Sequence, residues 1–277
     1  MEIDAGTTQE NTSYLVRPGG RVGYDVSGEG PLVVLVPGMG DLRASYRFLA
    51  PMLSRSGYRV ASSDLRGHGD SDATFSSYGD EATAGDIIAL IETLVGPAVV
   101  VGNSMAAGSA VLAAAERPEL VSGLVLVGPF VRDAPLSKLE RLVLDLALAP
   151  PFAPFSWRRY LPKLYAGRRP TDFAHYSDLV GDTLRRPGHA RAFSLTAHTS
   201  HRAAENRLGD VRAPSLVVMG DKDPDFTEPE KEAGWIAGVL GAKVAMVPDA
   251  GHYPQSQQPE MTAEAILGFL AEVDRRA

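Results

Sequence analysis

The ten residues from Val99 to Gly108 constrain this chain more than any other stretch. Three valines favour a β-strand, Gly102 interrupts it, and the alanines that follow favour a helix. The pattern predicts a strand, a tight turn and a helix, with Ser104 at the apex of the turn. A serine placed there projects from the backbone beside the free amides of the helix start. Attack on a carbonyl needs this arrangement, because fixed N–H donors must hold the oxyanion that forms.

Two other interpretations of this stretch are an ordinary strand-to-helix turn and a phosphate-binding loop. The chain has neither Gly-x-Gly-x-x-Gly nor Gly-Lys-Ser/Thr at this place, which argues against the phosphate loop. The small residues Gly102 and Ala106 on either side of the serine suit a turn in which strand and helix approach closely. The ordinary turn stays open from this stretch alone.

Composition excludes several classes of protein. The 277 residues contain no cysteine, so a disulfide framework, a thiol nucleophile and a cysteine metal site are excluded. A net charge of −7 argues against a nucleic-acid partner. Residues 1–11 are polar and acidic, unlike a signal peptide, and the most apolar run, Leu142 to Phe152, is too short to span a bilayer. We expect a cytoplasmic protein with a small-molecule substrate, no membrane partner, no cofactor and no metal; the oligomeric state stays open.

Strand and helix patterns alternate along most of the chain. A short hairpin is expected first, and the later strands are apolar throughout, which is typical of a parallel sheet covered on both faces. The sequence therefore predicts an α/β protein, a three-layer α/β/α sandwich with a mostly parallel eight-stranded sheet. The expected strands are Ser13–Val16, Arg21–Val26, Leu32–Val36, Arg59–Ser63, Ala98–Val101, Leu124–Val127, Ser215–Met219 and Lys243–Val247, and the expected helices are Ser45–Ser54, Asp80–Val95, Met105–Glu116, Glu228–Leu240 and Glu260–Val273.

One region breaks this alternation. Residues 134–213 show only helical patterns and carry many of the aromatic residues. We interpret them as a helical cap inserted into a core made of residues 1–133 and 214–277. The cap is expected over the carboxyl ends of the strands, where open α/β sheets bind ligands. Most of its aromatic side chains should fill its own core, and a few should reach the pocket.

A glycine-rich loop, Val36-Pro37-Gly38-Met39-Gly40, follows a buried strand. Such a loop can aim a backbone amide at the serine, so we expect the N–H groups of Met39 and Met105 to form an oxyanion hole. A simple turn into the next helix is the alternative.

The remaining catalytic groups are expected after the last strands. Asp223 is the preferred acid, because the Gly-x-x-Asp turn returns its carboxylate over the sheet edge, whereas Asp221 and Asp225 should be exposed on either side of it. Asp133, after an earlier strand, is a weaker alternative. His252 alone among the six histidines lies in a loop after one of the last sheet strands.

The other histidines indicate less. His68 lies in a turn that we interpret as structural. His198 and His201 are expected on one helix face, where they could resemble a metal pair; without a third ligand, partner contacts or solvent exposure are favoured. His175 and His189 carry no signal.

From Tyr14 to its end the chain resembles the α/β-hydrolase fold enzymes. Ser104, Asp223 and His252 follow the family's order of nucleophile, acid and histidine. The segments 64–72 and 251–260 also match sequence patterns that are common in the family. The resemblance implies that Ser104 is the nucleophile, that His252 is first general base and then general acid, and that Asp223 orients the imidazole.

The resemblance also narrows the chemistry. Dehalogenases and epoxide hydrolases of this fold carry aspartate at the nucleophile position, so Ser104 argues against both. We expect a hydrolase for a small, largely apolar carboxylic ester or lactone that works through an acyl-enzyme, with Gly38, Phe130, Trp157 and Tyr253 lining its pocket.

Two alternatives remain, and two positions depart from the family's pattern. Carbon–carbon hydrolases of ring-fission products share the Gly-Asn-Ser-Met string, although they usually have tryptophan where Tyr253 follows His252. A non-catalytic ligand-binding member of the fold is the other alternative. Pro37 and Ala106 stand where the family usually has histidine and glycine, which can alter the floor of the pocket.

Overall fold

A computed structural model describes residues 12–133 and 137–276. The predictions made on residues 1–11 and the expected start of the cap at residue 134 lie outside these ranges.

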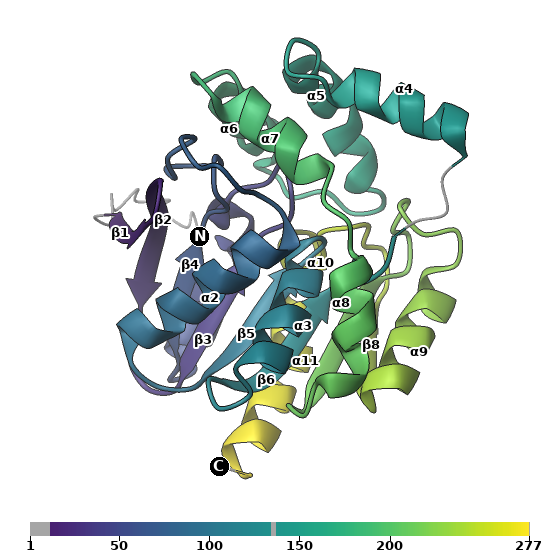
Figure 1. The fold of residues 1–277 in the computed structure, drawn as a ribbon. Helices are drawn as coiled ribbons and strands as arrows, with labels where there is room; N and C mark the ends of the chain where they lie inside the picture. Colours follow the sequence, from purple (N-terminus) through teal and green to yellow (C-terminus); the bar gives the residue numbers. More distant parts are fainter. Residues whose placement is uncertain (1–11, 134–136, 277) are drawn as a thin grey trace.

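Eight strands form one sheet in the order β1-β2-β4-β3-β5-β6-β7-β8 (Figure 1). They are β1 (Ser13–Arg17), β2 (Gly20–Ser27), β3 (Leu32–Val36), β4 (Arg59–Ser63), β5 (Ala98–Asn103), β6 (Val121–Val127), β7 (Ser215–Gly220) and β8 (Lys243–Val247).

The sheet is antiparallel at its start and parallel afterwards. β2 pairs antiparallel with β1 and with β4, and every later pair is parallel. All residues of β3, β5 and β7 are buried, as expected for strands covered on both faces. The predicted eight-stranded, mostly parallel sheet is therefore confirmed.

Helices cover both faces of the sheet (Figure 1). Side chains of α2 (Asp80–Leu94), α3 (Ala106–Glu116) and α9 (Pro229–Leu240) pack in one apolar cluster. Those of α1 (Leu49–Arg55) and α11 (Pro259–Asp274) pack in a second cluster on the opposite face. Alternate residues of β3 enter the two clusters, so the sheet is the middle of three layers.

The predicted helix over residues 45–54 is wrong in its bounds. A 3₁₀ turn, η1 (Arg43–Tyr46), comes first, and α1 starts separately at Leu49. Pro51 explains the break: it has no N–H to donate to a preceding turn, but it is tolerated in the first turn of a new helix. A four-residue helix, α10 (Pro254–Gln257), follows the loop after β8.

Between β6 and β7 lie α4 (Lys138–Leu148), α5 (Ala153–Leu164), α6 (Phe173–Leu184), α7 (His189–Ala197), α8 (Arg202–Arg207) and the 3₁₀ turn η2 (Leu208–Asp210). Figure 1 shows α4 to α7 as a separate layer over one end of the sheet, while α8 lies beside α3. Ala204 of α8 belongs to the same apolar cluster as α3. The division at residues 134 and 213 stays a prediction, and α8 packs with the sheet layer rather than with α4 to α7.

In the described ranges, no helix combines the length and apolar character needed to span a bilayer.

Candidate active site

Ser104 stands at the apex of a strained turn. β5 ends at Asn103, Ser104 has a φ of +58°, and α3 begins two residues later. Few residues other than glycine adopt this φ without a cost of about 1–3 kcal/mol, and such strain is concentrated at functional sites. A Cβ on Gly102 would lie 2.4 Å from the carbonyl oxygen of Ala106, so this close approach requires glycine at position 102. The expected tight turn is therefore present, and its geometry is typical of an exposed nucleophile.

The structure brings His252 and Asp223 together from two different loops. Asp223 follows β7 and His252 follows β8, at the carboxyl ends of neighbouring parallel strands. His252 Nδ1 lies 2.7 Å from Oδ2 of Asp223, and both side chains are buried. A Cβ on Gly128 would lie 3.1 Å from His252 Nδ1, so this glycine leaves room for the pair. The carboxylate holds the proton on Nδ1, which leaves Nε2 free to act as a base.

The main chain around His252 is tied to both parts of the molecule. Its N–H donates to the carbonyl of Leu164 at the end of α5, over 2.8 Å. Its carbonyl accepts from the side-chain amide of Asn103, over 3.2 Å, and the same amide donates to Val127. Asn103, which precedes Ser104, therefore links the turn of Ser104 with the loop that carries His252.

The prediction that Asp225 is exposed is wrong. Its side chain is only 15% exposed, and its Oδ2 lies 3.8 Å from His252 Nδ1. It accepts a hydrogen bond from the hydroxyl of Tyr160 in α5, and its N–H donates to Asp223 over 3.0 Å. The turn after Asp223 brings this second carboxylate back to the imidazole, a contact that spacing alone does not show. Asp221 is exposed, as expected.

The electrostatic surroundings of His252 stabilise its doubly protonated form, the imidazolium. Burial alone would lower the pKa of its imidazole, but the charge and hydrogen bond of Asp223 and the charge of Asp225 raise that pKa above its usual value. Burial also raises the pKa of Asp225, opposed by the nearby imidazole.

The Asp225→Asn variant should therefore shift the pH profile. Removing this charge destabilises the imidazolium, so His252 should lose its proton at lower pH and the acidic limb of kcat/KM should move to lower pH. The measurement is kcat/KM against pH for this variant, for the unchanged protein and for the exposed control Asp221→Asn. An acidic limb that stays in place, or moves to higher pH, would contradict this electrostatic role of Asp225.

Two backbone N–H groups are free beside Ser104. In the described ranges, neither the Met39 N–H nor the Met105 N–H donates to another group of the chain. The Met39 loop is fixed at its next residue: Gly40 donates to Nε2 of His68 over 3.0 Å and accepts from the indole N–H of Trp157 over 2.7 Å. Burial lowers the pKa of His68 to about 4, so its Nε2 stays an acceptor. From the sequence we interpret His68 only as structural. Its contact with the Met39 loop could not be predicted from the order of residues along the chain.

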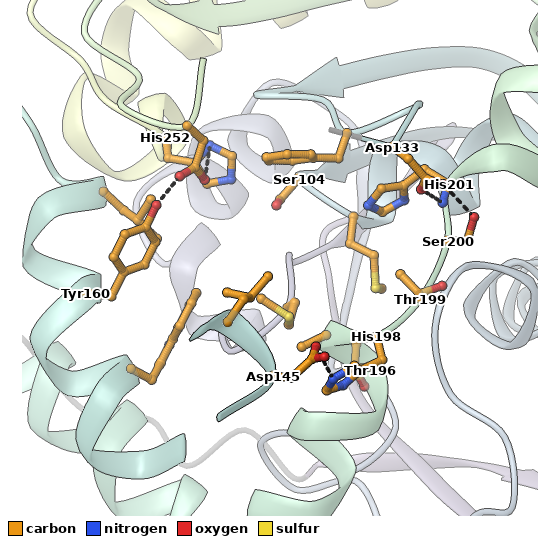
Figure 2. Close-up of a pocket in the computed structure, with 18 of the residues that line it drawn as sticks. Ser104, Asp133, Asp145, Tyr160, Thr196, His198, Thr199, Ser200, His201 and His252 are labelled. Atoms are coloured by element: carbon orange, nitrogen blue, oxygen red, sulfur yellow. Dashed lines mark hydrogen bonds and ion pairs between the residues drawn. The ribbon is translucent and has the colours of Figure 1, made fainter. Parts of the chain in front are cut away.

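The groups around Ser104 line a cavity of about 370 Å³ (Figure 2). Phe130, Trp157 and Tyr253, which we expect in the substrate pocket, are among the residues that line it. Gly38 does not; it lies behind the serine, where an added Cβ would be 2.6 Å from Cβ of Ser104. The predicted pocket role of Gly38 is therefore replaced by a packing role. The full lining is Met39, Ser104, Met105, Phe130, Asp133, Arg141, Leu144, Asp145, Trp157, Tyr160, Leu164, Thr196, Ala197, His198, Thr199, Ser200, His201, Asp225, His252 and Tyr253.

His198 and His201 do not share a helix face, which corrects the sequence-based expectation. His198 follows α7 and pairs with Asp145 over 3.0 Å, whereas His201 precedes α8 and pairs with Asp80 over 2.8 Å. Asp133 is the weaker alternative acid of the sequence analysis. It bonds to Ser200 and to the N–H of His201, whereas His252 Nδ1 pairs with Asp223.

Among the described residues, Asp223, Asp225 and His252 could each offer one metal ligand atom, and these atoms lie within 4.8 Å of one another. His252 Nδ1 already donates its proton to Asp223, and a metal bound there would have to replace that hydrogen bond. We interpret the group as a histidine held by an acid.

This chain belongs to the alpha/beta hydrolase family, whose sequence model matches residues 33–265. Among its relatives, 2-(acetamidomethylene)succinate hydrolase of Mesorhizobium japonicum is 29% identical over 268 residues, which cover 91% of this chain and 92% of that protein. The 2-hydroxy-6-oxo-6-phenylhexa-2,4-dienoate hydrolase of Burkholderia cepacia is 27% identical over 279 residues, 91% of each chain. The crystal structure of a bromoperoxidase from Bacillus anthracis shares the fold, with a TM-score of 0.80 and 20% identity over 94% of this chain and 99% of that one.

Proposed function

We propose that this protein is a serine hydrolase that cleaves a small, largely apolar carboxylic ester or lactone through an acyl-enzyme. The observation that carries the proposal is the buried 2.7 Å pair of His252 and Asp223 in the cavity that Ser104 lines from a strained turn. A general base oriented by an acid beside a projecting hydroxyl is the arrangement that activates serine.

In the first half of the reaction, Ser104 Oγ attacks the carbonyl carbon while Nε2 of His252 takes its proton. The negative charge that develops on the carbonyl oxygen is received by the N–H groups of Met39 and Met105. Asp223 stabilises the imidazolium that forms. His252 then gives its proton to the departing alcohol oxygen, and the acyl group remains on Ser104.

In the second half, water replaces the alcohol. His252 takes a proton from the water, the hydroxide attacks the acyl carbon, and Ser104 recovers its proton as the acid leaves. With a lactone, the alcohol and the acid are two ends of one product molecule.

The apolar walls of the cavity support a substrate with an alkyl or aryl body. In a series of p-nitrophenyl esters, each added methylene that is well packed should improve binding by up to ~0.8 kcal/mol, a several-fold gain in kcat/KM until the cavity is full. The measurement is kcat/KM from acetate to octanoate. A flat profile would mean that the acyl group stays in solvent, and would contradict an enclosed acyl site.

A carbon–carbon hydrolase is the second candidate. The relative from Burkholderia cepacia, whose name describes such an activity, favours it at 27% identity. The same assay decides between the two: 2-hydroxy-6-oxo-6-phenylhexa-2,4-dienoate is offered beside the esters. We expect esters to be hydrolysed with the higher kcat/KM. A higher kcat/KM for the dienoate would instead identify the protein as a carbon–carbon hydrolase.

A further inference from the structure

A second histidine in the cavity is held by a buried acid. His201 Nδ1 lies 2.8 Å from Oδ2 of Asp80, whose side chain is 1% exposed. Asp80 begins α2, and His201 lies just before α8, so residues far apart in the chain meet at this wall. An added Cβ on Gly108, inside α3, would lie 2.8 Å from Oδ2 of Asp80. Glycine inside a helix destabilises it by about 0.5–1 kcal/mol relative to alanine, and here it leaves room for the carboxylate.

The main chain around His201 is fixed as well. The hydroxyl of Thr199 accepts from the N–H of Asp80 over 3.1 Å, and Ser200 donates to Asp133 over 2.8 Å. The N–H of His201 donates to the other oxygen of Asp133 over 2.6 Å. The imidazole is therefore held from its ring and from its backbone, which is how positioning residues of a binding site are built.

His201 faces the same cavity as the nucleophile. Figure 2 shows His252 and His201 on either side of Ser104. The ring of Phe130 lies 5.8 Å, between centroids, from each of the two imidazoles. The imidazoles are therefore no further apart than twice that distance, which a small substrate can span.

In the neutral imidazole, the free ring nitrogen of His201 is an acceptor. A carboxylate can only accept, so Nδ1 carries the proton that is shared with Asp80, and in the neutral imidazole Nε2 keeps its lone pair. Within the described part of the chain, no group bonds to this Nε2. An acceptor on a cavity wall can bind a hydroxyl of the substrate.

We propose that His201, held by Asp80, is a specificity-determining residue that accepts a hydrogen bond from a hydroxyl group of the substrate. The substrate is then a hydroxylated ester or lactone, with its hydroxyl a few bonds from the scissile carbonyl. The charges of the cavity disfavour an anionic group on the substrate: Asp133, Asp145 and Asp225 line it against one arginine, Arg141. This inference rests on the proposed hydrolase function and deepens it.

The test compares hydroxylated p-nitrophenyl esters, 3-hydroxybutyrate and 6-hydroxyhexanoate, with the parent butyrate and hexanoate. The quantity measured is the ratio of kcat/KM for each hydroxylated ester to that of its parent. We expect a ratio above one for at least one pair, falling about three- to tenfold in His201→Phe, the worth of one neutral hydrogen bond. His201→Gln should retain part of the preference, because its amide oxygen also accepts.

Asp80→Asn tests the proton on the ring while leaving His201 in place. The amide can donate to Nδ1, which moves the imidazole proton to Nε2 and removes the acceptor, so the ratio should fall as in His201→Phe. His175→Gln, at an exposed position in α6, is the matched control and should keep the original ratio. Melting temperatures identify variants that do not fold; the Gln and Asn variants preserve side-chain size best.

Binding separates this inference from the proposed function. The dissociation constants of methyl 6-hydroxyhexanoate and methyl hexanoate on the Ser104→Ala protein give the same preference without turnover. If no ester is hydrolysed but the preference is present and depends on His201, the inference stands and the hydrolase function fails. If esters are hydrolysed and the ratios do not change in His201→Phe and Asp80→Asn, the inference is wrong and the hydrolase function stands. Absence of any preference in the unchanged protein, in rates and in binding, also overturns the inference.

Discussion

Replacing Ser104 or His252 with alanine should each lower kcat for ester hydrolysis by up to ~10⁶. The serine and the histidine act as one unit: without the base the hydroxyl is a weak nucleophile, and without the hydroxyl the base has nothing to activate. The double variant should therefore lose little more than either single variant. The measurement is kcat of the two single variants and the double variant on the best p-nitrophenyl ester.

Additive losses would show that the two residues act independently. Retention of more than a small fraction of the esterase activity in Ser104→Ala would contradict the assignment of the nucleophile. The melting temperature of each variant is the control for folding, since Ser104 lies in a strained turn and His252 is buried.

Converting Asp223 to asparagine should cost on the order of 10⁴ in kcat with the fold intact. The carboxylate now accepts the Nδ1 proton over 2.7 Å. An amide in its place can donate to Nδ1, which puts the proton on Nε2, where the base must be free. The loss should appear in kcat on the same ester.

Asp221→Asn is the matched control, because this acid lies in the same loop but is exposed; its kcat should stay near normal. Asp133→Asn should not move the ring proton of His252 from Nδ1 to Nε2, since Asp133 bonds to Ser200 and to the His201 backbone and not to His252. If Asp133→Asn were the crippling change and Asp223→Asn were mild, the acid would lie after β6 and the assignment would be wrong.

Local patterns were sufficient to predict the sheet and the loops that carry the candidate site. β3 and β8 have the expected bounds, because the apolar run in each strand ends at turn residues. Ser104, Asp223 and His252 each follow a strand of the parallel part of the sheet. Since the carboxyl ends of parallel strands meet at one edge, chain order and strand ends together indicate which side chains can meet.

Contacts made by turns and by the inserted helices could not be predicted in this way. Asp225 was expected in solvent, because nothing in its spacing shows that the turn after Asp223 returns it to the imidazole and to Tyr160 of α5. His201 carried no signal for its partner, since Asp80 lies 121 residues earlier in the chain. Gly38 was expected in the pocket, yet its packing role depends on the close approach of its backbone to Ser104, which spacing does not show.

Covalent labelling tests directly whether Ser104 is an activated nucleophile. The folded protein is treated with a fluorophosphonate, and the modified residue is identified by mass spectrometry of its peptides. We expect one label per chain, on Ser104, and loss of labelling in Ser104→Ala. Labelling at another residue, or none on a folded protein, would contradict it.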